Sequence, residues 1–313
     1  MRKGRTRAQI RVLPALRWLA LEDLNFSSPA AKSNQGYGGS IRQHVYRCSL
    51  SSKMSWTAAR TSGRPTAPDD GEPIWFASGE VTLFGLVYRP SATGAFPAVL
   101  WNHGGSHDQA GLGDLAQAFT RRGYVLFKPF RRGHRPSPGR FTGDLLEEAM
   151  KSGGEGERSK VLALELERHL VDQLAALEFL KGLPYVDRDR IAVMGTSFGG
   201  QQAMLAAERA EGIRAVACFA TAAMNWERAP DIRPLLLRAA ANARVPILLI
   251  QAENDYDLAP SEALAAELSR HGKSHRRVIL PAHGSSAGEG HRIVLASEKW
   301  AGEVFSFLEQ ALA

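Results

Sequence analysis

From about residue 72 onward, short solid apolar runs alternate with stretches in which apolar residues recur at helical spacing. A solid apolar run is typical of a strand buried on both faces, whereas recurrence every three to four residues is typical of an amphipathic helix. The predicted strands cover 74–77, 81–88, 98–101, 124–127, 191–194, 215–219, 247–250 and 277–280. The predicted helices cover 112–122, 161–181, 201–207, 261–270 and 298–311.

This alternation predicts an α/β fold. The first two strands are joined by a turn at Ser78-Gly79 and form a hairpin. Buried strands separated by helices indicate a mostly parallel sheet with helices on both faces. We expect one domain over residues 71–313, because no repeat or linker interrupts that range. In such a sheet, chemistry collects in the loops at the carboxyl ends of the strands.

Residues 1–70 differ from the rest of the chain in composition. They hold 12 of the 39 Lys and Arg residues but only 4 of the 32 Asp and Glu residues, so they carry +8 and the remainder −1 of the net +7. We interpret this segment as a basic, disordered extension, or as sequence that precedes a true start at Met54. A targeting segment and an arm that binds nucleic acid or a membrane surface stay open as alternatives.

Charge, hydropathy and cysteine content narrow the functional classes. Because residues 71–313 are electrically balanced, the pI near 9.6 does not indicate a nucleic-acid partner. The apolar runs are shorter than the roughly 18 residues of a membrane-spanning helix, so we expect no membrane partner. Cys48 and Cys218 are too few for a disulfide scaffold and lack metal-ligand spacing, which fits a cytoplasmic location.

A candidate nucleophile lies directly after the strand predicted over 191–194. The segment Gly195-Thr196-Ser197-Phe198-Gly199 has the pattern G-x-S-x-G, and a helical stretch follows it. In this strand–turn–helix context, the serine occupies a strained turn that lifts its hydroxyl above the sheet. The alternative is a glycine-rich turn of a nucleotide-binding fold, but the G-x-G-x-x-G spacing and the lysine of a phosphate loop are both absent here.

A candidate oxyanion site follows an earlier strand. Asn102-His103-Gly104-Gly105 succeeds the strand predicted over 98–101, and its glycines let backbone N–H groups face a bound oxyanion. We assign the donors to the backbone N–H groups of Gly105 and Phe198. His103 is interpreted as a residue that hydrogen-bonds the loop rather than as a catalytic base.

The catalytic acid is expected after the strand predicted over 247–250. Glu253, Asp255 and Asp257 all lie in the loop there. We select Asp255 for its distance from the strand, and expect Glu253 and Asp257 to cap or solvate the loop. A buried carboxylate in this place would hold an imidazole in the required tautomer.

Two histidines compete for the role of catalytic base. His283 and His291 both follow the strand predicted over 277–280. We prefer His291, because His283 comes soon after Pro281 and lies close to the strand end. His283 stays an alternative at this point.

These residues resemble a known family. The segment 186–200 is similar to the nucleophile segment of the dienelactone hydrolase-like and prolyl oligopeptidase-like branches of the α/β-hydrolases, and the loops of His103, Asp255 and His291 fall in matching order along the chain. The resemblance covers about residues 75–312 and implies an eight-stranded, mostly parallel sheet with a Ser-His-Asp triad. Dienelactone hydrolase itself uses a cysteine nucleophile where this chain has Ser197, and no segment is long enough for the β-propeller of the oligopeptidases.

The sequence therefore predicts a serine hydrolase. We expect Ser197 to attack a carboxylic ester or related carbonyl of a small molecule, with no metal or organic cofactor. A small peptidase or amidase that acts on short peptides, and a non-catalytic binding protein of the same fold, are the alternatives. Near the active-site mouth we expect the arginines of the 130–136 loop, either as ligands of an acidic substrate or as solvated charges. A mobile flap over 141–160 and a small cap over 226–238 are also expected.

Overall fold

The computed structural model describes residues 71–107 and 109–313, and the interpretations of residues 1–70, including Met54 and Cys48, lie outside this range. Eight strands form one sheet in the order β1-β2-β4-β3-β5-β6-β7-β8. The strands pair in parallel from β4 through β3 to β8, whereas β1 with β2 and β2 with β4 are antiparallel. Their bounds are β1 Glu72–Ser78, β2 Val81–Tyr88, β3 Phe96–Asn102, β4 Val125–Pro129, β5 Val186–Thr196, β6 Ala215–Phe219, β7 Ile247–Ala252 and β8 His275–Leu280.

The burial of each strand follows its place in the sheet. Every residue of β4, β6 and β7 is buried, as expected for inner strands covered on both faces. The edge strand β1 instead alternates between exposed and more buried positions. The solid apolar runs in the sequence therefore identified the inner strands, and the predicted α/β fold is confirmed.

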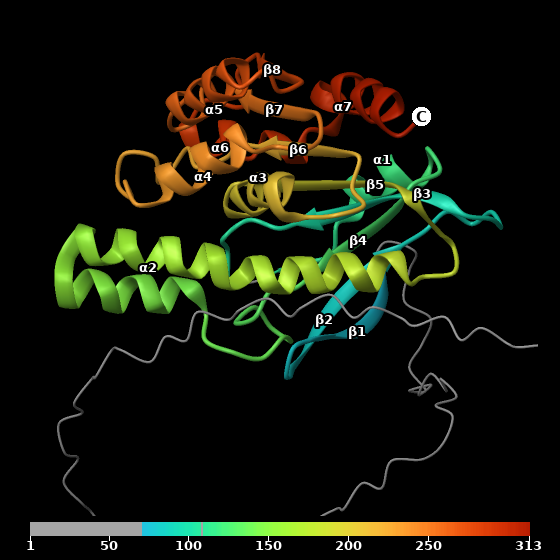
Figure 1. Cartoon of the computed structure of the whole chain (residues 1–313), viewed down its shortest axis with the longest axis horizontal. Helices are drawn as coiled ribbons and strands as arrows, with labels where there is room; N and C mark the ends of the chain where they lie inside the picture. Colours follow the sequence, from blue (N-terminus) through green and yellow to red (C-terminus); the bar gives the residue numbers. More distant parts are fainter. Residues whose placement is uncertain (1–70, 108) are drawn as a thin grey trace, which may run out of the picture. The chain divides into compact units, whose positions relative to one another are not determined.

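Helices cover both faces of the sheet and enclose two apolar cores. One core includes residues of α2, α3, α4 and α5, and the other includes residues of α1 and α7. Figure 1 shows α2 running across the sheet beside α3. The helices are α1 Gly113–Thr120, α2 Thr142–Lys181, α3 Phe198–Arg209, α4 Ile232–Ala241, α5 Ala259–Arg270, α6 Ala287–Gly290, the 3₁₀ turn η1 Ile293–Leu295 and α7 Ser297–Ala311.

The segment 141–160, expected to form a flap, is the first part of helix α2. Figure 1 shows α2 as two helical arms folded back on each other. The break lies at Gly154, whose φ of 67° and ψ of −159° are accessible to glycine but strained for other residues. Ser159 of the second arm is buried and accepts a hydrogen bond from the backbone N–H of Asp231 at 3.0 Å. The expected cap over 226–238 is also largely helix α4, which packs on the core through Ile232 and Leu236.

A buried ion pair ties α2 to the sheet. Asp172 of α2 is 2 % exposed and accepts two hydrogen bonds from Arg132, from Nε at 2.7 Å and from Nη2 at 2.5 Å. The Ser78 hydroxyl at the end of β1 donates to the same carboxylate at 2.7 Å. One carboxylate thus joins α2, β1 and the loop that follows β4.

Removing this carboxylate is expected to destabilise the fold strongly. Asp172→Ala leaves the partly exposed Arg132 guanidinium and the buried Ser78 hydroxyl without their acceptor, and we expect a loss of about 1–3 kcal/mol in the free energy of unfolding, measured by urea titration. Glu147→Ala, which breaks the exposed pair with Lys151 on the same helix, is the matched control and should unfold close to the wild type. Equal effects of the two substitutions would contradict the anchoring role of Asp172.

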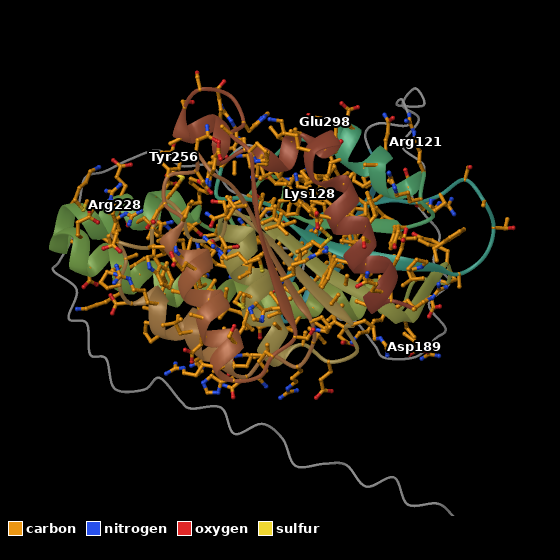
Figure 2. All side chains as sticks on the ribbon, turned by 90° about the horizontal axis from the view of Figure 1, so that it is seen from above. Arg121, Lys128, Asp189, Arg228, Tyr256 and Glu298 are labelled. Atoms are coloured by element: carbon orange, nitrogen blue, oxygen red, sulfur yellow. The ribbon has the colours of Figure 1, made fainter. Side chains whose placement is uncertain are left out.

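Lys128 of β4 is a second buried cation in the described residues. Its side chain is 3 % exposed, donates to the carbonyl of Ala110 at 2.6 Å and lies 4.9 Å from the centre of the Phe130 ring. Figure 2 shows Lys128 among the packed elements, whereas Asp189 lies at the periphery. Burial, and to a smaller extent the charge of Arg131, lower the pKa of Lys128 to about 7.

This pKa predicts that Lys128 makes stability depend on pH. The folded state disfavours the charged amine, so between pH 7 and the unfolded pKa of about 10.4 the unfolded chain binds more protons and stability rises with pH. Relative to Lys128→Met, the wild type should gain about 2 kcal/mol in the free energy of unfolding between pH 7 and pH 9. Urea titrations at both pH values measure this gain, and a pH-independent difference between the two proteins would refute the prediction.

Candidate active site

Ser197 lies at a sharp turn between β5 and α3. Its backbone has φ 56° and ψ −116°, a conformation that costs on the order of 1–3 kcal/mol for a non-glycine residue. The backbone N–H of Ser197 donates to the carbonyl of Phe219 in the neighbouring strand at 2.9 Å, which holds the turn on the sheet. The helix α3 begins at the next residue, so its N-terminus lies beside the hydroxyl.

The glycines around Ser197 are required by close backbone approaches. A Cβ on Gly195 would lie 2.2 Å from the carbonyl oxygen of Gly199. A Cβ on Gly199 would lie 2.0 Å from the carbonyl oxygen of Asn102. These contacts are with backbone atoms, which cannot move aside as a flexible side chain does. The G-x-S-x-G pattern therefore reflects the tight packing of the turn against the loop after β3.

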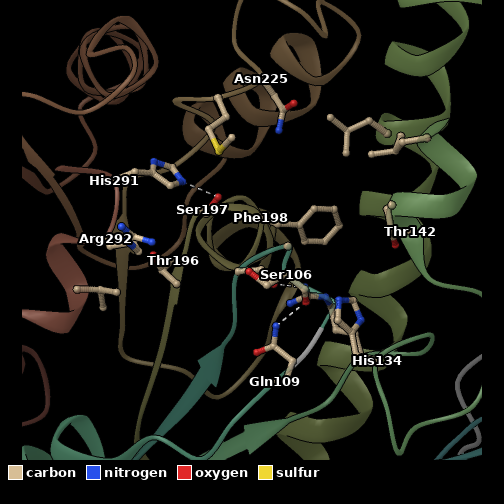
Figure 3. A pocket seen from close by; sticks show the side chains of 18 of the residues that line it. Ser106, Gln109, His134, Thr142, Thr196, Ser197, Phe198, Asn225, His291 and Arg292 are labelled. Carbon is tan, nitrogen blue, oxygen red and sulfur yellow. Dashed lines mark hydrogen bonds between the residues drawn. The ribbon is translucent and has the colours of Figure 1, made fainter. Parts of the chain in front are cut away.

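A continuous hydrogen-bond chain joins the three predicted triad residues. The Nε2 atom of His291 lies 2.9 Å from Ser197 Oγ, as Figure 3 shows, and its Nδ1 atom lies 2.7 Å from Asp255 Oδ1. Because an ionised carboxylate only accepts hydrogen bonds, Nδ1 carries the proton in this arrangement. Nε2 is then free to accept the proton of the Ser197 hydroxyl.

Asp255 is oriented by its own partners. Its Oδ2 atom accepts a hydrogen bond from Gln251 Nε2 at 2.9 Å, and its Oδ1 atom also accepts one from the backbone N–H of Tyr256 at 2.7 Å. The two neighbouring carboxylates have other contacts. Asp257 accepts the backbone N–H of Ala259 at the start of α5 at 2.8 Å. Glu253, in turn, accepts the backbone N–H of Ala282 at 3.2 Å.

The structure brings His291, and not His283, next to Ser197. The backbone N–H and carbonyl of His283 are hydrogen-bonded to the side chain of Asn254, at 3.0 and 3.2 Å. His291 follows the short helix α6, which begins with a capping box between Ser286 and Glu289. Backbone and hydroxyl hydrogen bonds from Ser285 and Ser286 lower the pKa of Glu289 to about 2.

Sequence reasoning missed this capping box, although the S-x-x-E pattern at 286–289 signals it. The Tyr256 ring, also missed, packs edge-on against the His291 ring with centroids 5.4 Å apart. Together the capping box and the Tyr256 contact fix the position of His291 in the loop after β8.

The loop after β3 lies directly over the nucleophile turn. A Cβ on Gly104 would be 3.7 Å from the Cβ of Ser197, and one on Gly105 would be 3.8 Å from the Cβ of Phe198. The Asn102 side chain anchors the loop to β5 through a 3.2 Å hydrogen bond to the carbonyl of Met194. Gly105 and Phe198, the two predicted oxyanion donors, are therefore neighbours above Ser197.

His103 supports this loop from beneath. It is 2 % exposed, and its Nδ1 atom lies 2.8 Å from the carbonyl oxygen of Gly104, while its Nε2 atom accepts a weak hydrogen bond from the backbone N–H of Arg131 at 3.4 Å. Burial, followed by the charge of Arg131, holds the pKa of His103 well below 6.5. The ring is neutral and bonded to the loop, as the sequence predicts.

A cavity of about 540 Å³ opens beside Ser197 and His291. Both arms of α2 line it, as do the segment after β6 and the region around η1. Its apolar lining comes from Leu146, Leu162, Phe198, Met224, Val294 and Leu295, and its arginines are Arg131, Arg158, Arg228 and Arg292.

The arginines expected in the 130–136 loop differ from one another: Arg135 is exposed, as a solvated charge would be, whereas Arg131 and Arg132 have protein partners. Arg132 pairs with Asp172, and Arg131 is buried with its guanidinium on backbone carbonyls. Neither is a solvated surface charge or a free ligand for an acidic group.

The described residues form no cluster of side chains suited to bind a metal ion. Within 71–107 and 109–313, no group of three or more His, Cys, Asp and Glu side chains is arranged to hold a metal ion. Across the same ranges, none of the helices is both long and apolar enough to cross a lipid bilayer. Cys218 is buried and free.

The similar solved structures share the fold. An acylaminoacyl peptidase from Pyrococcus horikoshii matches with a TM-score of 0.59 and 20% identity over 77% of this chain and 41% of that one. Est1E from Butyrivibrio proteoclasticus, solved with bound ferulic acid, matches with a TM-score of 0.56 and 18% identity over 76% of this chain and 98% of that one. A puromycin-hydrolysing peptidase of Mycobacterium tuberculosis matches with a TM-score of 0.58 and 19% identity, over 81% and 42% of the two chains.

Sequence comparisons find a curated relative and a matching family model. The quorum-quenching protein AidA of Acinetobacter baumannii (strain MDR-ZJ06) is 28% identical over 154 residues, which is 49% of this chain and 43% of that protein. The chain thus spans less than half the length of this curated relative. The model of the dienelactone hydrolase family matches residues 85–311. Since this match covers most of the sequence and agrees with the hydrolase fold of the solved structures, the chain belongs to the dienelactone hydrolase family.

Proposed function

We propose that the chain is a serine hydrolase that cleaves a carboxylic ester, or a related acyl bond, through an acyl-enzyme. The observation that carries this proposal is the hydrogen-bond chain from Asp255 through His291 to Ser197, with contacts of 2.7 and 2.9 Å. Such a chain makes a hydroxyl nucleophilic, because the imidazole takes its proton while the carboxylate stabilises the resulting cation. Membership of a hydrolase family supports the same reaction class.

In the first step, Ser197 Oγ attacks the carbonyl carbon as its proton moves to His291 Nε2. The carbonyl oxygen becomes an oxyanion, for which the backbone N–H groups of Gly105 and Phe198 are the proposed donors. His291 then returns the proton to the departing alcohol, which leaves Ser197 acylated. In the second step, water gives a proton to His291 and attacks the acyl carbon; the bond to Ser197 Oγ then breaks, His291 returns the proton to that oxygen, and the acid is released.

The cavity indicates a small-molecule substrate. A volume of about 540 Å³ lies within the range of roughly 300–1,000 Å³ that is typical of ligand pockets. Its apolar lining suits the hydrocarbon part of an acyl group or alcohol. Short peptide amides are the second candidate, favoured by the fold shared with the acylaminoacyl peptidase. Location in the cytoplasm stays a prediction from the sequence.

Replacement of the nucleophile tests this proposal. We expect Ser197→Ala to lower kcat/KM for p-nitrophenyl acetate and butyrate by at least about 10³-fold, because no hydroxyl remains to be acylated. The melting temperature should not fall, because replacing the hydroxyl by hydrogen removes no packing contact. Ser269→Ala, on the far helix α5, is the matched control and should retain wild-type rates. Retention of wild-type hydrolysis by Ser197→Ala would exclude Ser197 as the nucleophile.

The roles of the acid and the base are tested by paired variants. Asp255→Asn should lower kcat roughly 10³- to 10⁴-fold, because an amide no longer holds His291 in the required tautomer. Asp257→Asn, which removes only the charge of a carboxylate bonded at the start of α5, should leave kcat within about threefold of the wild type. His291→Ala should likewise lower kcat strongly, whereas His283→Ala should leave kcat close to that of the wild type. Steady-state rates on one ester decide both comparisons, and a dependence on Asp257 or His283 would reverse the assignment.

Running the same assay on short peptide p-nitroanilides separates the two candidate functions. An esterase is expected to favour the esters by a large factor in kcat/KM. Comparable or higher values on the anilides would make the chain a peptidase with the same triad.

A further inference from the structure

Arg131 is a buried cation whose hydrogen bonds in the described residues go to carbonyl oxygens. Its side chain donates from Nη1 to the carbonyl of His103 at 2.6 Å and from Nη2 to the carbonyl of Gly104 at 2.8 Å. The residue is 3 % exposed, and its Nε atom has no partner among the residues described. Arg132, the next residue, instead has the Asp172 carboxylate as its partner.

This arrangement is unfavourable for stability alone. A buried charge without a paired counter-charge carries a large desolvation penalty, and apolar side chains of similar volume often replace buried charges without loss. Burial lowers the pKa of Arg131 to about 9, despite the opposing influence of Asp172. A buried cation with this penalty is explained by a role that an apolar side chain does not provide.

The peptide unit held by Arg131 includes one of the proposed oxyanion donors. A planar trans peptide directs its C=O and its N–H to opposite sides. The carbonyl of Gly104 and the N–H of Gly105 belong to the same peptide unit. Because Arg131 and the Nδ1 atom of His103 both bond that carbonyl, the N–H of Gly105 is directed away from them. Gly105 also lines the cavity that contains Ser197.

The same guanidinium contacts the residue that carries the other donor. The guanidinium carbon of Arg131 lies 4.6 Å from the centre of the Phe198 ring, within the range of a cation–π contact. Phe198 is the first residue of α3, and its backbone N–H follows the nucleophile directly. Arg131 therefore connects the loop after β3 with the start of α3. Figure 3 shows the Phe198 side chain beside Ser197 in the cavity.

We propose that Arg131 is the positioning residue of the oxyanion site, which it sets by fixing the Gly104–Gly105 peptide and the Phe198 side chain relative to each other. This inference rests on the proposed hydrolase function. The guanidinium also polarises the peptide that it bonds, so the N–H of Gly105 becomes a stronger donor to a developing negative charge.

The test replaces Arg131 and compares the effect with that of its neighbour. Arg131→Met keeps much of the volume but removes both hydrogen bonds, whereas Arg131→Lys keeps the charge and loses the two-pronged geometry. Arg132→Met is the matched control, since Arg132 contacts Asp172 rather than the loop. Titration with a fluorophosphonate counts the active sites in each preparation, and kcat is expressed per titrated site.

We expect Arg131→Met to lower kcat per site by about 10- to 10³-fold, up to the roughly 10²- to 10³-fold found when an oxyanion donor itself is lost, with KM within about threefold of the wild type. The inhibition constant of a trifluoromethyl ketone, which forms a tetrahedral adduct, should rise by a similar factor. Arg131→Lys should recover only part of kcat. Arg132→Met should lower the melting temperature but leave kcat per site unchanged.

Three results would overturn the inference. The first is a kcat per site for Arg131→Met within threefold of the wild type. The second is a rise in KM at unchanged kcat, which would make Arg131 a substrate ligand. The third is an equal loss of kcat per site in Arg132→Met. A wild type that neither hydrolyses esters nor reacts with the fluorophosphonate would instead refute the proposed function itself.

If Arg131→Met does not fold, the inference is tested on Arg131→Ala, whose kcat is measured with and without added guanidinium ion. Guanidinium ion can occupy the vacated space and donate to both carbonyls, whereas ammonium ion has the same charge without the planar fork. Recovery of kcat by guanidinium and not by ammonium supports the inference. Equal recovery, or none with either ion, contradicts it.

Discussion

The left-handed turn at Ser197 is the constraint on which the rest of the site depends. It forces the chain from β5 directly into α3 and leaves the hydroxyl above the edge of the sheet. Backbone packs so closely around the turn that a Cβ at Gly195 or Gly199 would overlap a neighbouring carbonyl. The hydrogen bond from Ser197 N–H to Phe219 and the covered sheet beneath supply the stability that offsets this strained conformation.

The parallel sheet explains why distant segments meet at this turn. Parallel strands present their carboxyl ends at one edge, so the loops that follow β3, β5, β7 and β8 share a single region. β3 and β5 are neighbours, which sets the loop after β3 against Ser197. β7 and β8 are also neighbours, which sets Asp255 against the loop that carries His291. The topology thus supplies two adjacent pairs of loops, and their side chains complete the site.

Much of this arrangement was predictable, because Ser197 and Asp255 each follow a solid apolar run, whereas the strand before His291 is of mixed polarity and mostly half-buried. Those runs predicted the α/β fold, and the order of strands located Ser197, Asp255 and His291. The choice between His283 and His291 depends on the capped turn at 286–289 and on contacts with Asn254, which span separate loops. Periodicity alone could not supply contacts of that kind.

Other features could not be predicted from the sequence, for physical reasons. The first arm of α2 is rich in glycine and charge, and it is helical because its buried positions pack on the rest of the protein. The segment therefore had the composition of a flap. Arg131 and Arg132 are neighbours of the same residue type, yet one bonds carbonyls of the oxyanion loop and the other bonds Asp172 of α2. Only the tertiary structure separates their roles.

The convergence of these loops is tested most directly by a crystal structure of the protein after reaction with a phosphonate ester. We expect a covalent bond between phosphorus and Ser197 Oγ, with the phosphonyl oxygen at about 2.7–3.1 Å from the backbone nitrogens of Gly105 and Phe198. His291 should remain between Ser197 Oγ and Asp255. A phosphonyl group attached to another residue, or an oxygen that points away from both backbone nitrogens, would contradict the account.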